Sequence, residues 1–314
     1  MPDLRYSPIS RLEETLIHPL LEDEAKAWMA DLDWDYSPVR RILLSFIRQR
    51  LLPGYAAVAG GAAVGYTYFL VNRSKAIIGA LYTRPDAPSR DAAGELLSLA
   101  ISCLKDMPAV RRVEAQIMPF HRQELTPEFT RHGFRFTPRH YLELDLSLHR
   151  KRAEPPDAAR CIPWEPALLP PLASMTAVSY ENQADAVICE DYRSPAGCEG
   201  YLRSLVENPG CGIFMPEASF VALDREGAPC GFVLCCRISP GAAIIPQIAV
   251  HPRSQGQRLG NMLMNRALVQ LKSLGFRTVS LTVTEENVRA FGWYGRLGFK
   301  TRKQFGAYVW LRDS

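Results

Sequence analysis

A glycine-containing loop between an apolar stretch and an amphipathic stretch is the segment best suited to chemistry. It reads Val250-His-Pro-Arg-Ser-Gln-Gly-Gln-Arg-Leu-Gly-Asn261. Where such a loop opens a helix, free N–H groups converge and the helix dipole adds partial positive charge, so the loop can bind a phosphate. Arg258 adds a full charge, and Gly256 and Gly260 let a pyrophosphate approach the backbone closely. Taken alone, the loop is equally compatible with an ordinary surface turn.

A second pattern with chemical potential lies downstream, in a segment with helical spacing. The residues Asn287, Ala290 and Tyr294 are three and four positions apart, so they share one helical face. The helix is expected to run from about Glu285 to Gly298. Because a lone helical tyrosine more often packs in a core, a functional role for Tyr294 is indicated only by the full pattern and by its distance from the loop.

Together these two patterns resemble motifs A and B of the GNAT superfamily of N-acyltransferases. Motif A, Arg/Gln-x-x-Gly-x-Gly/Ala, corresponds to residues 255–260, with Arg258 in the place of the first glycine. Motif B, Asn-x-x-Ala-x-x-x-Tyr-x-x-x-Gly-Phe, corresponds to residues 287–299. The resemblance implies acetyl-CoA as co-substrate. The residues that it assigns to this ligand are Ile248, Ala249, Val250, Gln255, Gly256, Gln257, Arg258, Leu259, Gly260, Asn261, Asn287 and Ala290.

The resemblance also implies a mechanism of direct attack by an amine on the thioester. Tyr294 is then the general acid that protonates the departing thiolate, a role that typically contributes about 10²–10⁴-fold to the rate. A backbone N–H of the strand before the loop would hold the oxyanion. Pro246, which has no N–H, predicts a bulge or an unpaired position in that strand.

The general base is not identified by the sequence. Gln247 stands near the position where the family often has a glutamate, and an amide cannot act as a base. Glu285 and Glu286 could act through water, although acidic residues in a first helical turn also favour the dipole. Glu190 and Asp191 lie in a long loop where family members contact substrate. We therefore expect Glu190, Asp191, Gln247 and Glu285 on the acceptor side.

An internal repeat organises the whole chain. Landmarks recur in the same order at a common shift of about 166 residues, which indicates a duplicated domain. The paired landmarks are Gly65 and Gly231, Pro85 and Pro252, Val113 and Val279, and Gly133 and Gly298.

The repeat predicts an α/β fold of two tandem GNAT-like domains, each a mixed, largely antiparallel sheet flanked by helices. The expected boundaries are a degenerate domain at 1–148, a linker at 149–159 and a catalytic domain at 160–314. The second copy is expected to contain helices at 167–180, 195–207 and 260–274, and strands at 219–223, 230–238, 242–250, 277–283 and 305–311. This tandem architecture is similar to that of mycothiol synthase, but no residue pattern indicates the same substrate.

The first copy is expected to be catalytically silent. Its counterpart of the phosphate loop is the segment 88–93, where Asp91 replaces Arg258 and only Ala93 fits the motif. Phe129 takes the place of Tyr294, and Arg122 takes that of Asn287.

Composition excludes several classes of protein. The net charge of +4 and the scattered basic residues do not indicate a nucleic-acid partner. The uncharged run 53–71 is rich in Ala and Gly and reads as two strands around Gly60-Gly61, so no membrane partner is expected. The eight cysteines form no CxxC pair, which fits a cytoplasmic setting without a metal.

Two other functions remain open at this stage. One is a non-catalytic acyl-CoA-binding sensor, which the absence of a base beside Tyr294 allows. The other is transfer from aminoacyl-tRNA, against which the phosphate loop and the weak net charge both argue. The primary function expected is acetyl transfer to a small-molecule or peptide amine. The acceptor, the acyl-chain length and the oligomeric state are not determined by the sequence.

Overall fold

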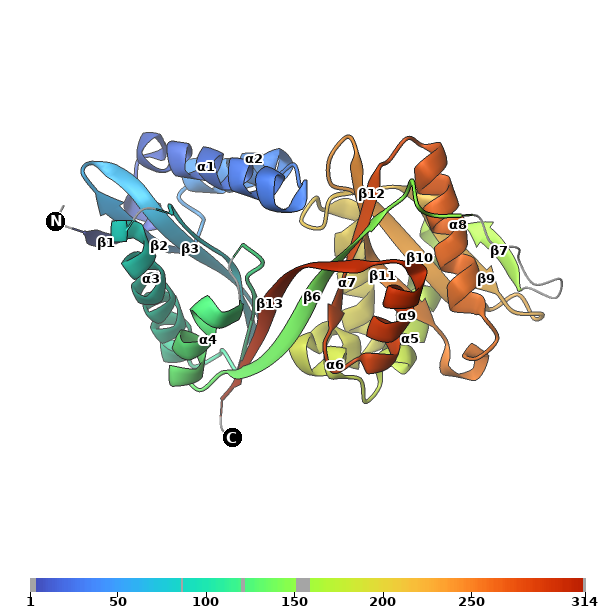
Figure 1. Ribbon diagram of the computed structural model, residues 1–314. Helices are drawn as coiled ribbons and strands as arrows, with labels where there is room; N and C mark the ends of the chain where they lie inside the picture. Colours follow the sequence, from blue (N-terminus) through green and yellow to red (C-terminus); the bar gives the residue numbers. More distant parts are fainter. Residues whose placement is uncertain (1–3, 86, 120–121, 151–158, 313–314) are drawn as a thin grey trace. The chain divides into compact units, whose positions relative to one another are not determined.

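The chain forms two compact units in a computed structural model, which describes residues 4–85, 87–119, 122–150 and 159–312 (Figure 1). The side chains of residues 87–91, 122 and 123 lie outside this description. The first unit comprises Met1–Arg139 and Gln304–Ser314, and the second comprises His140–Lys303.

The first unit is an α/β structure with strand order β1-β2-β3-β4-β5-β13. Its strands are β1 (Arg5–Pro8), β2 (Gly54–Ala59), β3 (Ala62–Asn72), β4 (Lys75–Thr83), β5 (Arg112–Gln116), the start of β6 (Arg135–Asp145) and the end of β13 (Lys300–Leu311). Its helices are α1 (Glu14–Leu32), α2 (Ser37–Arg48), α3 (Ala87–Asp106) and α4 (Arg122–Arg131), with a 3-10 turn at Ile9–Arg11.

The second unit repeats this plan with strand order β6-β12-β11-β10-β9-β7, and β8 also pairs with β10. Its strands are β7 (Arg160–Pro163), β8 (Ile213–Phe214), β9 (Phe220–Leu223), β10 (Pro229–Arg237), β11 (Ala242–Val250) and β12 (Thr278–Thr284). Its helices are α5 (Leu169–Tyr180), α6 (Ala184–Ile188), α7 (Pro195–Glu207), α8 (Leu259–Ser273) and α9 (Val288–Leu297). Shorter 3-10 turns are at Pro166–Leu168, Glu190–Arg193, Pro216–Ala218 and Pro252–Ser254.

Equivalent glycines make the same packing possible in both units. Gly65 of β3 pairs with Thr83, and Gly231 of β10 pairs with Val250, so the register is repeated. A Cβ at Gly65 would lie 3.1 Å from Leu96 of α3, and one at Gly231 would lie 3.0 Å from Leu263 of α8. The missing side chain therefore lets a helix pack closely against the strand. These contacts confirm the duplicated α/β fold that the repeat predicts.

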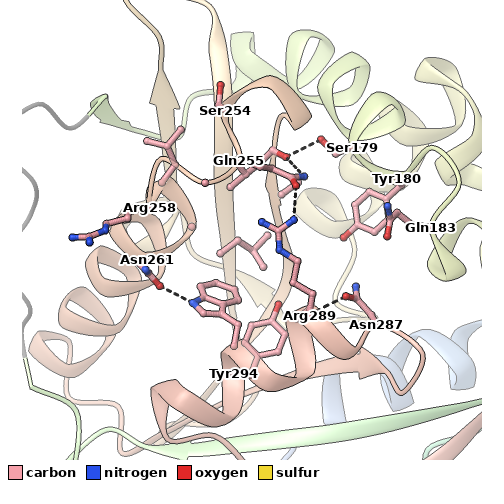
Figure 2. A pocket seen from close by; sticks show the side chains of 18 of the residues that line it. Ser179, Tyr180, Gln183, Ser254, Gln255, Arg258, Asn261, Asn287, Arg289 and Tyr294 are labelled. Carbon is pink, nitrogen blue, oxygen red and sulfur yellow. Dashed lines mark hydrogen bonds between the residues drawn. The ribbon is translucent and has the colours of Figure 1, made fainter.

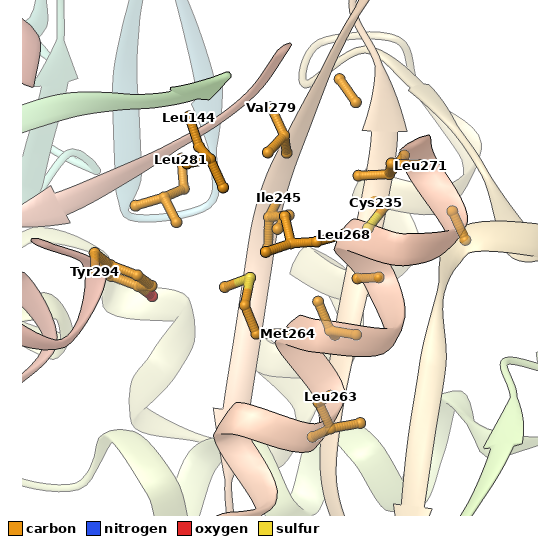
Figure 3. Packing of buried hydrophobic residues seen from close by; sticks show 14 of the residues in the cluster. Leu144, Cys235, Ile245, Leu263, Met264, Leu268, Leu271, Val279, Leu281 and Tyr294 are labelled. Carbon is orange, nitrogen blue, oxygen red and sulfur yellow. The ribbon is translucent and has the colours of Figure 1, made fainter. Parts of the chain in front are cut away.

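The core of the second unit lies beneath α8 (Figure 3). Leu263, Leu268 and Leu271 of α8 are completely buried against β10, β11 and β12. Burial of one such leucine stabilises the fold by about 1.5–3 kcal/mol, so this cluster fixes the start of α8 relative to the sheet. Gly275, with φ +87°, follows this helix in the left-handed conformation expected at its C-terminal end.

The division into units differs from the expected boundaries at two strands. The sequence suggests that residues 142–146 close the first copy, but Leu142, Leu144 and Leu146 are buried in the core of the second unit. Conversely, Ala307–Leu311 of β13 pairs with β5 of the first unit. The repeat identifies equivalent strands but does not determine which core each strand joins. Of the expected linker, residues 151–158 lie outside the described part of the chain.

The uncharged run 53–71 forms the hairpin of β2 and β3, as predicted. Gly60 (φ +58°) and Gly61 (φ +79°) occupy its turn, a conformation that favours glycine. Within the described ranges, no helix has both the length and the apolar character needed to span a bilayer.

Candidate active site

A cavity of about 430 Å³ opens in the second unit between β11, the start of α8, α9 and the end of α5 (Figure 2). Its lining combines backbone of the strand, the glycine-containing loop and three arginines. The lining residues are Ser179, Tyr180, Gln183, Ile248, Ala249, Val250, Ser254, Gln255, Gly256, Arg258, Leu259, Gly260, Asn261, Asn287, Arg289, Ala290, Trp293, Tyr294 and Arg296.

Divergence of two parallel strands creates the floor of this cavity. β11 pairs with β12 from Ala242 and Thr278 as far as Ile244 and Ser280. The β11–β10 register shifts between Leu234 and Cys236, which gives β11 one extra residue around Pro246. The bulge predicted from Pro246 is therefore confirmed. Beyond it β11 contributes residues 248–250 to the cavity wall, where an extended ligand can lie along the strand.

The loop before α8 has the backbone geometry of an anion site. Gly256 adopts φ +81°, and a Cβ there would meet no atom within 4 Å, so the approach is open. Arg258 adopts φ +61°, ψ +12°, directly before the first residue of α8. The first-turn amides of α8 have no acceptors within the helix, and the helix dipole favours an anion there.

Arg258 has the left-handed conformation that suits the glycine expected at this point of the motif. A side chain in this conformation costs roughly 1–2 kcal/mol. The Arg258 side chain is exposed and points away from Tyr294 (Figure 2). Arg289 reaches over the cavity instead, and its NH1 donates to Gln255 Oε1 at 2.8 Å. Sequence reasoning missed Arg289 because its only signal is its place between Asn287 and Ala290.

Helix α9 carries Ala290 and Tyr294 of the second motif, whereas Asn287, predicted on the same helical face, is the residue before the helix, with φ −81° and ψ 62°. Asn287 Oδ1 accepts from the Ala290 amide at 3.1 Å and so caps the helix, which explains why α9 begins at Val288 and not at Glu285. Tyr294 is 7% exposed. Burial raises the pKa of the Tyr294 phenol, and the charge of Asp185 raises it further. Tyr294 is therefore protonated at neutral pH, as a proton donor must be.

A hydrogen bond joins the two helices beside the loop. Trp293 Nε1 donates to Asn261 Oδ1 at 2.6 Å. A Cβ added at Gly260 would lie 3.6 Å from the Trp293 ring, an ordinary contact distance. Alanine would therefore fit at position 260, whereas a larger side chain would enter the cavity.

A second cavity of about 740 Å³ adjoins the first. Tyr180 and Gln183 line both cavities. The remaining lining residues come from the end of α5, the α5–α7 connection, the start of α7 and the turn after β12. They are Ala177, Val178, Glu181, Asn182, Ala184, Ala186, Val187, Tyr192, Arg193, Pro195 and Glu286.

The four residues expected on the acceptor side occupy different positions. Gln247 is 2% exposed and bonds Tyr180 and Tyr192 behind the second cavity's wall. Glu190 and Asp191 flank Tyr192 in a 3-10 turn. Glu285 Oε2 lies 3.3 Å from His140 Nε2. None of the four is among the residues that line the two cavities described.

Three further predicted residues lie outside either the cavity lining or the described side chains. Gln257 is exposed and donates to the Arg253 carbonyl at 3.4 Å, outside the cavity lining. The proposed effects of the Asp91 and Arg122 side chains lie outside the described residues. The residues that sequence reasoning missed are Ser179, Tyr180 and Gln183 of the α5 end, together with Ser254, Arg289, Trp293 and Arg296.

Comparison with known proteins agrees with the geometry. Residues 187–299 match the sequence model of the Acetyltransferase (GNAT) family. An uncharacterized N-acetyltransferase of Methanocaldococcus jannaschii is 32% identical over 127 residues, which cover 38% of this chain and 52% of that protein. The peptidyl-lysine N-acetyltransferase YjaB of Salmonella typhimurium is 34% identical over 88 residues, 28% of this chain and 54% of that protein. The chain thus spans about half the length of these relatives.

Solved structures match the whole chain in fold. A tandem GNAT protein from the clavulanic acid biosynthesis pathway superposes with a TM-score of 0.67 and 15% identity, covering 99% of this chain and 100% of that one. A GCN5-related N-acetyltransferase from Sphaerobacter thermophilus gives a TM-score of 0.71 and 17% identity, covering 99% and 96%. The tandem fold therefore extends over both units.

Proposed function

We propose that the second unit transfers an acetyl group from acetyl-CoA to a primary amine, a proposal supported by the match of residues 187–299 to the Acetyltransferase (GNAT) family. The observation that carries this proposal is the junction of three features in one cavity. These are the diverging strand β11, the glycine-containing loop before α8 and the phenol of Tyr294.

The residues present fit the co-substrate in charge and in space. The first-turn amides of α8, with Arg289 and Arg296 nearby, suit the pyrophosphate. The open space at Gly256 allows the phosphate to approach the backbone. Residues 248–250 and the small side chain of Ala290 leave room for the pantetheine arm.

The chemistry requires a group that supplies a proton to the leaving thiolate. The amine nitrogen bonds to the thioester carbon, the C–S bond breaks, and the Tyr294 hydroxyl gives its proton to the sulfur. The amine releases a proton to solvent, and the Tyr294 phenolate regains one. The second cavity, which shares Tyr180 and Gln183 with the first, is the proposed entry for the amine.

The proposal is tested by measuring thiol release from acetyl-CoA with the full chain and a panel of primary amines. We expect thiol release that depends on the amine and saturates with acetyl-CoA, together with formation of the acetylated product. Absence of turnover with small amines and with lysine peptides would contradict acetyl transfer.

A second function is favoured by one observation. Gln247 occupies the place of the expected base, and both ends of its amide are hydrogen-bonded to tyrosines. This arrangement also fits a sensor that binds acetyl-CoA without turnover. Tight binding in calorimetry, with no thiol release over the amine panel, would favour the sensor.

A further inference from the structure

Three side chains form a hydrogen-bonded row behind the junction of the two cavities. Tyr192 Oη donates to Gln247 Oε1 at 2.9 Å. Gln247 Nε2 donates to Tyr180 Oη, also at 2.9 Å. Gln247 and Tyr192 are buried, whereas the Tyr180 side chain reaches both cavities. The row therefore connects a buried amide with the phenol of Tyr180, which lines both cavities.

The direction of these bonds determines where the Tyr180 proton points. Because the Tyr192 hydroxyl occupies the carbonyl end of the Gln247 amide, the NH₂ end faces Tyr180. Tyr180 Oη accepts this bond, so its own O–H remains available to donate elsewhere. Figure 2 shows Tyr180 on the side of the cavity opposite Arg258.

Ring packing holds Tyr180 in this position. The Tyr180 and Tyr192 rings stack with centroids 4.2 Å apart and planes at 9°. Tyr192 in turn meets Tyr201 edge-on at 5.2 Å. Because the phenol is fixed before a ligand arrives, it would not need to reorganise during the reaction.

Tyr180 stays in its protonated form at neutral pH. Burial raises its pKa well above the usual value and the charges of nearby groups raise it further, while the smaller effect of the hydrogen bond from Gln247 lowers the pKa. The titratable groups that act on it are Asp185 on α6, Tyr294 on α9 and Tyr201 on α7. Tyr180 is thus a hydrogen-bond donor and not a base.

We infer that Tyr180 donates its hydrogen bond to the thioester carbonyl oxygen and stabilises the oxyanion, and that Gln247 is the positioning residue that orients it. This inference rests on the proposed acetyl transfer. If the Tyr180 hydroxyl donated to the amine nitrogen, it would weaken the lone pair that attacks the thioester. A hydrogen bond to the carbonyl oxygen instead stabilises the negative charge that develops there. When the C–N bond forms, the π electrons of the carbonyl move to this oxygen, and they return as the C–S bond breaks.

Gln247 has a specific advantage over glutamate in this arrangement. A carboxylate only accepts hydrogen bonds, so it would draw the Tyr180 O–H toward itself and away from the ligand. A glutamine offers a donor to Tyr180 and an acceptor to Tyr192 at once. The residue that replaces the expected base therefore has a defined role.

The test compares Tyr180→Phe, Gln247→Glu and the control Tyr141→Phe in the full chain. Tyr141 also carries a buried phenol of the second unit, but it bonds Ser280 outside both cavities. Tyr180→Phe should lower kcat by roughly 10²–10³-fold, the usual cost of one oxyanion donor, with the Kd for acetyl-CoA unchanged. Tyr141→Phe should retain kcat within about twofold.

Gln247→Glu gives the sharper result because it keeps the size of the side chain but replaces the donor that faces Tyr180 by an acceptor, and it adds a buried charge that can be titrated away. Its kcat should fall nearly as far as that of Tyr180→Phe, and it should recover as the pH decreases and the introduced carboxylate gains a proton. In the Tyr180→Phe background, Gln247→Glu should have little further effect, because its target hydroxyl is gone.

Two results would overturn the inference. If Gln247→Glu were more active than the wild type, the introduced glutamate would be acting as a general base. Tyr180 would then not need the glutamine to orient its hydroxyl. Full activity of Tyr180→Phe would show that its hydroxyl does not reach the reacting group. Both are read against wild-type turnover, so a wild-type chain without turnover would contradict the proposed function instead.

Discussion

The two copies of the fold keep the same aromatic pair but differ by one hydroxyl. In the second unit, Tyr294 meets Phe299 edge-on with centroids 5.7 Å apart at 64°. In the first unit, the equivalent Phe129 and Phe134 meet at 5.1 Å and 66°. Phe129 is completely buried and stacks on Tyr308 at 3.8 Å. The packing role of the ring is retained, while the phenol that could donate a proton is absent.

The loops before the equivalent helices differ more. Helix α8 begins at Leu259, after a loop with two residues at positive φ. Helix α3 begins at Ala87, five residues ahead of Ala92, the equivalent of Leu259. The segment corresponding to the phosphate loop is therefore helical in the first unit, and its amides from residue 91 onward bond within the helix, whereas the equivalent residues of the second unit form a loop before α8.

The equivalent strands β4 and β11 differ in the size of the side chains near the register shift that each contains. Tyr82 of β4 stands where Ala249 lines the cavity. The Tyr68 ring covers Gly79 so closely that an added Cβ there would clash with it. Thus an aromatic residue stands in the first unit at the position where a small one borders the cavity of the second. The fold persists on its glycines and core while the side chains at the positions that face the ligand change.

The largest effect expected from this comparison concerns Glu24, which is buried in the aromatic filling of the first unit. Tyr66 donates to Glu24 Oε2 at 2.5 Å, and Trp28 donates to Oε1. Burial raises the pKa of Glu24 to about 7. Because the folded state binds this proton more tightly, the free energy of unfolding should fall by about 3 kcal/mol as the pH rises from about 4.5 to about 7.

Glu24→Gln should remove this pH dependence, since the amide does not titrate. Urea unfolding of both proteins at pH 5 and pH 8 measures the difference. Parallel pH profiles for wild type and variant would show that Glu24 does not titrate in this range.

The next largest effect separates the two aromatic pairs. Tyr294→Phe should lower kcat by roughly 10²-fold or more with little change in acetyl-CoA affinity, because only the proton donor is lost. The reciprocal change Phe129→Tyr should add no second activity, since the loop of the first unit is helical. If Tyr294→Phe keeps kcat within a factor of two, the role of Tyr294 is packing alone and its hydroxyl is not the proton donor.

A smaller effect is expected at the loop itself. In Gly260→Leu the side chain should enter the cavity and weaken acetyl-CoA binding by more than about 1.4 kcal/mol, a tenfold change. Gly200→Leu is the matched control, since a Cβ at this helical glycine of α7 meets no atom within 4 Å. Equal affinity of the two variants in calorimetry would argue against a ligand at this loop.

The smallest effect tests the departure from the motif. Arg258→Gly should relieve the left-handed strain and raise the free energy of unfolding by about 0.5–1 kcal/mol after the entropy of glycine is counted. The equivalent Asp91→Gly falls in the helical backbone of α3, where glycine is unfavourable. Denaturation curves should therefore shift in opposite directions, and equal shifts would contradict the difference between these segments.

Much of the fold follows from the sequence because its signals are local. The landmarks around Gly65, Gly231 and Gly298 mark positions where backbone geometry or close packing requires glycine. The placement of residues 142–146 in the core of the second unit could not be predicted. Their alternation of apolar and polar residues indicates that one face of the strand is buried, but not which of the two cores it joins. Motif spacing brought Gly260, Asn287 and Tyr294 together, as the cavity shows.

The acceptor side was less accessible to sequence reasoning. Tyr180 and Gln183 end a helix far along the chain from both motifs, and only the tertiary structure brings them to the cavity. The role of Gln247 depends on hydrogen-bond direction, which a residue type does not reveal.

We propose that only the second unit retains a site for acetyl-CoA. Calorimetric titration of the full-length chain with acetyl-CoA tests it most directly. We predict one binding site per chain, abolished or weakened at least tenfold by Gly260→Leu. Two sites of comparable affinity, or one site insensitive to that substitution, would contradict the account.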